Sequence, residues 1–358
     1  VRKPWAGYGH TAFLSAPGDD DRSELLGIWS APQGKVVGPG DGPAWAEAKA
    51  GFKSSLMVHA TLREHLLVAH WIVANGLSRA ARETTGPEHP LRRLLRPHYY
   101  NTAGINHTAL DSLLPVRSLG FRMFAFTEEA WPRLFSDFAT AWRWESFPDR
   151  MKREAAGGAF PHMPLIEDGL ELWHVMRAHA MDYLVLWYPT DDALQADQEV
   201  VDFWNHFETQ KTGGWGLGEL TLDTLADLIG DLIFHCTAGH EVVGAIVEFL
   251  ATPHSLPGKL VPGRSEPDVQ SHALVLATIS LTGLRQPQLL DTWRHMYDHA
   301  ESWTRDQKDA AIKQGRRFQA SLTGVAKAIE DRNEVRERKG ARRFQACNPR
   351  ILEASVSI

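Results

Sequence analysis

The sequence is poor in cysteine, and it lacks long apolar runs and an excess of basic residues. Its 358 residues include two cysteines, Cys236 and Cys347, and neither belongs to a Cys-x-x-Cys pair. A disulfide framework is therefore excluded, and a reducing compartment, the cytoplasm, is expected. No apolar stretch approaches the ~18 residues that span a bilayer, so stable membrane insertion is not expected.

The charge balance is slightly acidic. Acidic residues outnumber basic ones by 44 to 38, which gives a net charge of −6. The basic runs are short pairs, such as Arg92-Arg93 and Arg342-Arg343, which fit solvated surface positions better than a nucleic-acid interface. Nucleic acid is thus excluded as an expected partner, and no sequence signal fixes the oligomeric state.

Helix-forming patterns dominate what is present. From Trp45 to about Arg82 the chain has no proline and is rich in alanine and leucine, which predicts one long helix ending before Gly86-Pro87. Further helical patterns occupy 127–145, 168–188, 195–210, 219–251, 286–300 and 305–338. Residues 1–43 are rich in Gly, Pro and Asp and predict an irregular arm without a core of its own. We therefore predict a mostly α protein whose main domain is 44–358.

One predicted helix has no polar face. Residues 229–250 read IGDLIFHCTAGHEVVGAIVEFL, and a helix that is apolar all round belongs in the centre of a large fold. It carries His235 and His240, two of the 17 histidines in the chain. Because buried polar groups need hydrogen-bond partners or a metal, this helix is a candidate for a metal site.

Five groups of residues, in order along the chain, resemble motifs of the lipoxygenase family. They are His65-Leu66-Leu67-x-x-His70 after Trp45-x-x-Ala48-Lys49, then His89-Pro90-x-x-x-Leu94-Leu95-x-Pro97-His98 with Ile105-Asn106, Asp168-Gly169-Leu170-Glu171-Leu172-Trp173, Phe234-x-Cys236-Thr237-Ala238-x-His240, and Arg332-Asn333 before the closing Ser355-Val356-Ser357-Ile358. Each motif is weak alone, but their common order is specific. The resemblance implies a lipoxygenase-like helical bundle around two long buried metal-bearing helices, without the family's N-terminal β-sandwich.

The resemblance also implies a non-haem iron site. The family binds iron with two histidines five residues apart on one helix, a third histidine on a second helix, and the carboxylate of a terminal isoleucine. A π-type widening brings residues i and i+5 onto one face. On this pattern His65, His240 and Ile358 are expected ligands of iron, and the same donors also suit manganese. No catalytic group is expected beyond the metal and its bound water.

Two positions depart from the family pattern when the motifs are matched without gaps. The first family histidine falls on Ala60, so the neighbouring His59 is expected to take over after a one-residue shift of the helix bulge. The position four residues after His240 is Gly244, which cannot ligate. The ligand set is therefore expected to shrink to three or four, which leaves space on the metal for water, oxygen or a chelating substrate.

A second register pairs His65 with His70, since these also lie five residues apart. It needs about five inserted residues before His65 and about four deleted ones afterwards, which a long buried helix rarely tolerates. The gapless register is preferred, so His70 is expected beside the ligands or in the core. His235 is likewise expected as a core histidine, with lining an altered pocket as its alternative.

The activity that the resemblance implies is that of a dioxygenase of lipid metabolism. It would remove a hydrogen from an unsaturated lipophilic substrate and add O₂, and apolar residues such as Leu66 and Val243 are expected to line the substrate cavity. Two alternatives stay open. Lost ligands favour an iron-dependent oxidation of a smaller specialised metabolite. Ala60 and Gly244 together favour a non-catalytic scaffold that kept the fold and lost its metal.

Overall fold

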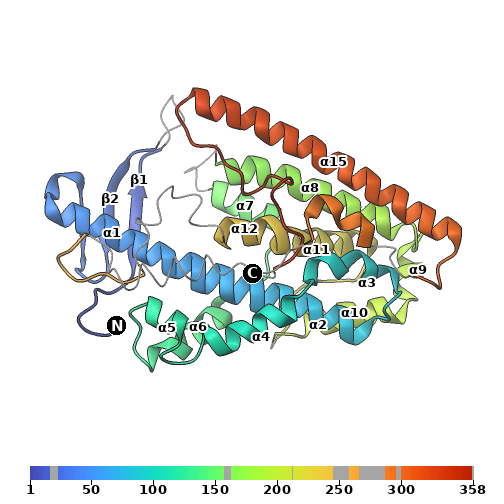
Figure 1. Ribbon diagram of the computed structural model, residues 1–358, viewed down its shortest axis with the longest axis horizontal. Helices are drawn as coiled ribbons and strands as arrows, with labels where there is room; N and C mark the ends of the chain where they lie inside the picture. The colour runs from blue at the N-terminus through green and yellow to red at the C-terminus, as the bar shows by residue number, and fades with distance from the viewer. Residues whose placement is uncertain are drawn as a thin grey trace.

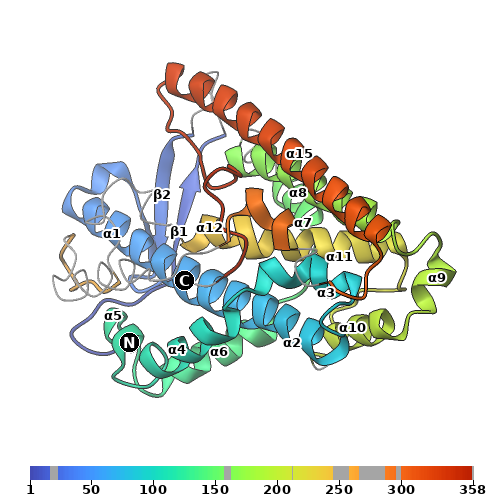
Figure 2. The same ribbon diagram turned by 45° about the vertical axis from the view of Figure 1, so that its right-hand side comes forward.

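The computed structural model describes residues 1–16, 23–156, 163–211, 213–244, 258–265, 287–295 and 300–356. Most of them lie in helices, which confirms the mostly α prediction. Two long helical runs lie against each other at the centre, and further helices surround them (Figures 1 and 2). In the part of the chain that the structure describes, no helix has the length and hydropathy needed to cross a membrane.

The first central run is continuous from Pro43 to Thr84. It consists of α1 (Pro43–Val58), the π-helix η2 (His59–Ala74) and α2 (Asn75–Thr84). Proline suits the first position, because the amide it lacks would have no partner within the helix. The run confirms the predicted long helix. Its π character shows in the amide of Asn75, which donates to the carbonyl of His70, five residues earlier.

The second central run contains α11 (Leu222–Phe234), the π-helix η4 (His235–Gly239) and α12 (His240–Gly244). Thr221 begins it with a capping box, in which its hydroxyl accepts from the amide of Thr224. The last seven residues of α11 are all buried, as an apolar helix in the centre of a fold should be. Residues 245–251, the rest of the predicted helix, lie outside the described residues.

Other helices cover both sides of the central runs. On one side α8 (Pro164–Leu184) packs on α11, and α15 (Arg305–Arg338) packs on α8, while α4 (Thr102–Ser112) and α6 (Ala130–Ala141) contact η2 on the other (Figure 2). The shorter helical segments are η1 (Pro39–Asp41), α3 (Pro90–Leu95), η3 (Arg96–Tyr99), α5 (Leu119–Met123), α7 (Phe147–Ala156), α9 (Asp191–Gln195), α10 (Gln198–Glu208) and η6 (Leu289–His295).

The prediction of an irregular arm over residues 1–43 is wrong. Strands β1 (His10–Leu14), β2 (Leu25–Ser30) and β3 (Lys35–Val37) form an antiparallel sheet in that order. Ile28 and Val37 are fully buried and pack with Ala48 of α1, so this segment shares a small core with the first central run. Its Gly, Pro and Asp residues connect strands that are too short for their alternation to stand out.

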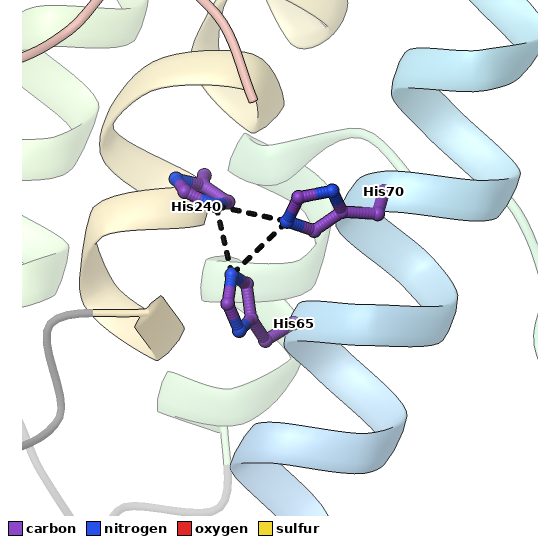
Figure 3. Close-up of side chains that lie close together, drawn as sticks. All are labelled: His65, His70 and His240. Atoms are coloured by element: carbon purple, nitrogen blue, oxygen red, sulfur yellow. Dashed lines mark hydrogen bonds between the residues drawn. The ribbon is translucent and has the colours of Figure 1, made fainter. Parts of the chain in front are cut away.

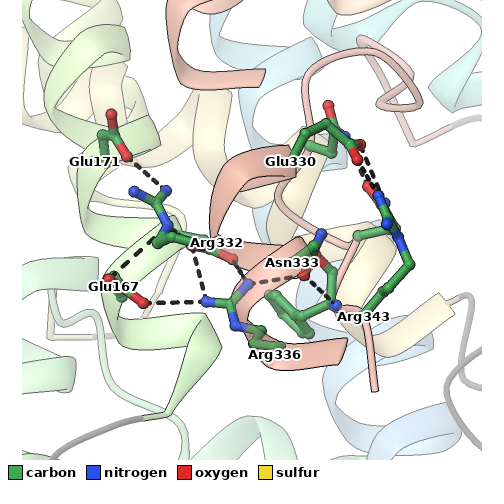
Figure 4. Close-up of polar contacts among 11 residues, drawn as sticks. Glu167, Glu171, Glu330, Arg332, Asn333, Arg336 and Arg343 are labelled. Atoms are coloured by element: carbon green, nitrogen blue, oxygen red, sulfur yellow. Dashed lines mark hydrogen bonds and ion pairs between the residues drawn. The ribbon is translucent and has the colours of Figure 1, made fainter. Parts of the chain in front are cut away.

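The chain reverses direction after α15 and returns toward the centre. Asn333 holds this reversal, because its Nδ2 donates to the carbonyl of Phe344 (2.9 Å) and its Oδ1 accepts from the amide of Phe344 (2.8 Å). Arg332 and Arg336 reach from α15 to α8, as Figure 4 shows. Both donate to Asp168, a carboxylate with no exposed surface, at 2.6 Å and 2.8 Å.

The returning tail is fixed by hydrogen bonds from the segment around η3. His98 Nδ1 donates to the carbonyl of Ala354 (2.8 Å), and Thr102 Oγ1 donates to that of Val356 (3.3 Å). The Ser355 hydroxyl donates to the carbonyl of Tyr100 (3.1 Å). Val356 is fully buried, so the described tail ends inside the protein. Ile358, an expected metal ligand, lies outside the described residues.

Helix α11 carries a buried carboxyl group, Asp231. Its Oδ1 accepts from the Trp173 indole (2.7 Å) and from the amide of Phe147 (3.0 Å), which ties α11 to α8 and to the start of α7. Loss of hydration on burial outweighs the two hydrogen bonds, which lower the pKa, and raises it from 3.8 to about 7, with smaller contributions from the carboxylates of Asp227 and Asp149.

The raised pKa makes stability depend on pH. Between pH values of about 3.8 and 7 the Asp231 carboxyl is protonated in the folded protein and ionised in the unfolded chain. The contribution of Asp231 to the free energy of unfolding should therefore fall as pH rises through this window, by up to about 1.4 kcal/mol per pH unit. Asp231→Asn should remove this contribution, so the variant should gain stability relative to the wild type as pH rises. Urea denaturation at both ends of the window tests it, and a difference between wild type and variant that does not change with pH would contradict it.

Candidate metal centre

Three histidines from the two central runs converge on one point (Figure 3). His65 and His70 belong to η2, and His240 is the first residue of α12. The Nε2 atoms of His65 and His240 are 2.8 Å apart, those of His65 and His70 are 3.2 Å apart, and those of His240 and His70 are 3.3 Å apart. We call these three residues the histidine triad.

The π-helical geometry of η2 explains how two histidines of one helix meet. In an ideal α-helix, residues five apart point ~140° away from each other. A π-helix adds a residue to each turn, so residues five apart share a face. The ring centroids of His65 and His70 are accordingly only 4.8 Å apart. On the second central run, the π-helix η4 directly precedes His240. The amide of His240 donates to the carbonyl of His235, five residues earlier.

Two members of the triad, His65 and His240, are uncharged in the physiological pH range. His70 and His240 are buried and His65 is half-buried. Loss of hydration, with a smaller contribution from the neighbouring histidines, lowers the pKa of His65 to about 3 and the pKa of His240 well below its ordinary value. Neutral imidazoles have a lone pair to offer, which is the form that binds metals.

Asn106 of α4 orients one member of the triad. Its Nδ2 donates to the carbonyl of His70 (3.0 Å), which leaves its Oδ1 to accept from Nδ1–H of His70 (2.9 Å). The proton of His70 is thereby held on Nδ1, and the lone pair of Nε2 points toward His65 and His240. Asn106 belongs to one of the sequence motifs, but its role could not be predicted, because no spacing rule relates it to His70, which lies 36 residues earlier.

The nitrogen separations fit a bound cation. Metal–imidazole bonds of ~2.1 Å at octahedral or tetrahedral angles would hold the nitrogens about 3.0–3.4 Å apart. The observed range of 2.8–3.3 Å is close to this. Since Asn106 holds the proton of His70 on Nδ1, all three Nε2 lone pairs can point at one cation when His65 and His240 also carry their protons on Nδ1. The residues present therefore suit a transition metal.

The structure contains the pairing of His65 with His70 and not that of His59 with His65. His59 is outside the triad: its Nε2 lies 3.4 Å from Glu64 Oε1, and half of its side chain (50%) is exposed. The gapless register therefore misplaced the first histidine of the pair, and His70, expected beside the ligands or in the core, is itself in the triad. Metal ligation by any of these residues stays a prediction.

The other predicted site residues have different positions. His235 stands outside the triad beside Trp144, and loss of hydration lowers its pKa to about 4. Leu66 is buried in an apolar cluster with Met57 and Leu62. Val243 is half-buried, and its place in a substrate cavity stays a prediction. Gly244 faces the triad, since a β-carbon built on it would lie 3.3 Å from His65 Nε2.

Asn106→Ala should weaken metal binding without unfolding the protein. The variant frees the His70 ring to rotate and to move its proton, and the loss of such a supporting hydrogen bond typically costs 10–100-fold in metal affinity. Competition with a chelator of known affinity measures the change. As a control, Asn348→Ala removes an amide that bonds Glu330 and Gln345, which lie outside the triad. Equal affinities in wild type and Asn106→Ala would contradict the orienting role.

Known proteins resemble this chain in sequence. The lipoxygenase family model matches residues 14–244. The seed linoleate 9S-lipoxygenase of Glycine max is 25% identical over 388 residues, covering 91% of this chain and 42% of that protein. The linoleate 9/13-lipoxygenase of Pseudomonas aeruginosa is 26% identical over 338 residues, covering 88% and 48%. The chain thus spans less than half the length of these curated relatives.

Solved structures show the same fold. A lipoxygenase crystallised anaerobically in complex with arachidonate superposes with a TM-score of 0.84 at 17% identity, covering 98% of this chain and 55% of that one. The coral 8R-lipoxygenase superposes with a TM-score of 0.83 at 17% identity, covering 98% and 56%. Because the family model covers well over half of the sequence and includes both histidine-bearing runs, the chain belongs to the lipoxygenase family.

Proposed function

We propose that this chain is a non-haem iron dioxygenase that removes a hydrogen from an unsaturated lipophilic substrate and adds O₂ to the carbon radical left behind. The observation that carries the proposal is the convergence of three imidazole nitrogens within 3.3 Å of one another. Family membership supports the reaction type. Manganese accepts the same donors and is the alternative metal.

The residues that would hold the iron are His65, His70 and His240, each through Nε2, with the carboxylate of Ile358 as a further proposed ligand. Iron held by such donors supplies one-electron oxidation of a weak C–H bond and reactivity with O₂. Neutral imidazoles suit this task because they bind both oxidation states. Asn106 keeps His70 in the tautomer that offers Nε2.

The surroundings of the triad would keep water away from a reactive intermediate. His70 and His240 have 3% and 6% of their surface exposed, and His65 is the more open member. A substrate would therefore approach from the side of His65, where the half-buried Val243 is proposed as part of the lining. Leu66, by contrast, supports the helix from within its apolar cluster.

Polyunsaturated fatty acids are the substrate class that we propose first. The relatives named above are linoleate lipoxygenases, and a related structure was solved with arachidonate. Iron-loaded protein should consume O₂ and form a conjugated-diene hydroperoxide from linoleate or arachidonate. His240→Ala serves as the control for adventitious iron. Turnover that persists in this variant, or none with either fatty acid in the iron-loaded wild type, would count against the proposal.

The proposed ligation by Ile358 leads to a prediction about the tail. Residues appended after Ile358 should lower metal occupancy far more than they lower the melting temperature, because they replace a carboxylate with an amide. Val356, two residues before Ile358, is buried and accepts a hydrogen bond from Thr102, which supports this proposal. Elemental analysis of tagged and untagged protein tests it. Full occupancy in the tagged form would remove this carboxylate from the ligand set.

A second candidate function is iron-dependent oxidation of a smaller specialised metabolite. The observation that favours it is Gly244, a residue without a donor at a position that faces the triad. A metabolite screen followed by oxygen consumption separates the two candidates. Activity confined to a small polar substrate would favour the second, and activity confined to fatty acids would favour the first.

A further inference from the structure

Helix α4 contacts both the histidine triad and the returning tail. Thr102, its first residue, donates through Oγ1 to the carbonyl of Val356 at 3.3 Å. Asn106 lies four residues later, one turn on and on the same face, and makes its two hydrogen bonds to His70. Thr102 and Asn106 are both buried, with 0% and 5% of their surface exposed. One face of α4 therefore holds the tail at one turn and a member of the triad at the next.

The hydrogen bonds between the tail and the segment 98–102 fix the register of the tail. Each of the three successive residues 354–356 makes one hydrogen bond with this segment. The first bond comes from His98 Nδ1 (2.8 Å) and the third from Thr102 Oγ1 (3.3 Å). A slip of the tail by one residue would break all three bonds, and the carbonyl groups involved would be left buried without these partners.

A metal ligand at the end of a chain needs this kind of support. Chain ends are poorly ordered unless they are tied down. A ligand that has to be ordered when the metal arrives costs binding free energy, whereas a ligand that folding has already placed does not. Val356 lies two residues before Ile358. Of the hydrogen bonds described for the tail, the one from Thr102 is thus the nearest in sequence to the proposed carboxylate ligand.

We infer that Thr102 is a positioning residue of the metal centre, which acts by holding the tail so that the carboxylate of Ile358 is available to the metal. This inference rests on the proposed function and on its ligation by Ile358. Helix α4 then positions two ligands from opposite ends of the sequence, Ile358 through Thr102 and His70 through Asn106.

The test compares Thr102→Val with wild type, each with the native chain end and with residues appended after Ile358. Iron(II) affinity is measured without oxygen by competition with a chelator. With the native end, Thr102→Val should bind iron at least about tenfold more weakly, because the carboxylate must then be ordered as the metal binds. With the appended end, which replaces the carboxylate with an amide, the same substitution should cause no further loss. The electron spin resonance spectrum of the iron(III) form should likewise differ between wild type and variant only with the native end.

Three further variants separate positioning from general damage to the fold. Thr102→Ser keeps the hydroxyl and should restore the affinity of the wild type, and Thr102→Ala gives a second variant without the hydroxyl. Thr85→Val is the matched control, because it removes another buried threonine hydroxyl, which donates to the carbonyl of Ala81 instead of the tail. It should bind iron as the wild type does.

The possible failures are distinguishable. Equal iron affinities of wild type and Thr102→Val with the native end would overturn the inference and leave the metal site intact. A loss of the same size with both chain ends would also overturn it, because Thr102 would then not act through the carboxylate. An appended end that leaves the affinity of the wild type unchanged would overturn the ligation by Ile358 and this inference with it. A wild type that binds no metal would instead defeat the proposed function.

Discussion

His70→Ala should lose metal almost completely, whereas His59→Ala should bind metal like the wild type. His70 contributes one of the three converging nitrogens, so its loss removes one of the proposed metal ligands together with the ring that Asn106 orients. We expect the metal affinity to fall by more than about 100-fold, beyond the effect of losing a supporting hydrogen bond. His59 is half exposed beside Glu64 and contributes nothing to the triad.

The measurement is metal content after dialysis against a weak chelator, with circular dichroism to show that each variant is folded. His235→Ala is a matched control on the second central run, because it removes a half-buried histidine five residues before His240 and outside the triad. Loss of metal in His59→Ala together with retention in His70→Ala would restore the gapless register and contradict the triad.

Asp168→Ala should cost about 3–5 kcal/mol in the free energy of unfolding, the range found when one partner of a buried ion pair is removed. Asp168 has no exposed surface and accepts from both Arg332 and Arg336. Without it, the only carboxylate partners described for the two largely buried guanidinium groups are the more exposed Glu167 and Glu171, and Arg336 also keeps its hydrogen bond to Asn333. Urea denaturation followed by circular dichroism measures the loss.

Asp331→Ala is the matched control. Asp331 pairs with Lys327 one turn away on the exposed face of α15, and such surface pairs contribute little to stability. Its free energy of unfolding should be nearly that of the wild type. If Asp168→Ala unfolded at the same urea concentration as Asp331→Ala, the buried pair would not be what ties α15 to α8.

The two central runs could be predicted because each carries a strong local pattern. A long proline-free stretch and an apolar stretch predict the two helices that meet at the triad, whereas the choice of His65 and His240 among their histidines depends on the resemblance to the lipoxygenase family. Matching without gaps puts His70 outside the ligand set, because it assumes that this chain and the family have no insertions or deletions around the two histidines of the helix. The five-residue spacing of His65 and His70 was the better guide, since it is the spacing that a π-helix turns onto one face.

The contacts between distant segments could not be predicted from one sequence. Asn106 lies 36 residues from His70, and Asp168 lies 164 residues from Arg332, so no local periodicity links them. The short strands β1 to β3 were missed for a different reason. Their stability depends on packing against α1, and turn-forming residues between them dominated the local pattern.

The most direct test of the central claim is elemental analysis of the native protein with an unmodified C-terminus, purified without chelators. The histidine triad predicts about one iron, or one manganese, per chain, because three imidazole nitrogens converge on a single point. A protein that contains no transition metal, and takes none up when iron(II) is offered without oxygen, would contradict the claim and leave a lipoxygenase-fold scaffold as the reading of this chain.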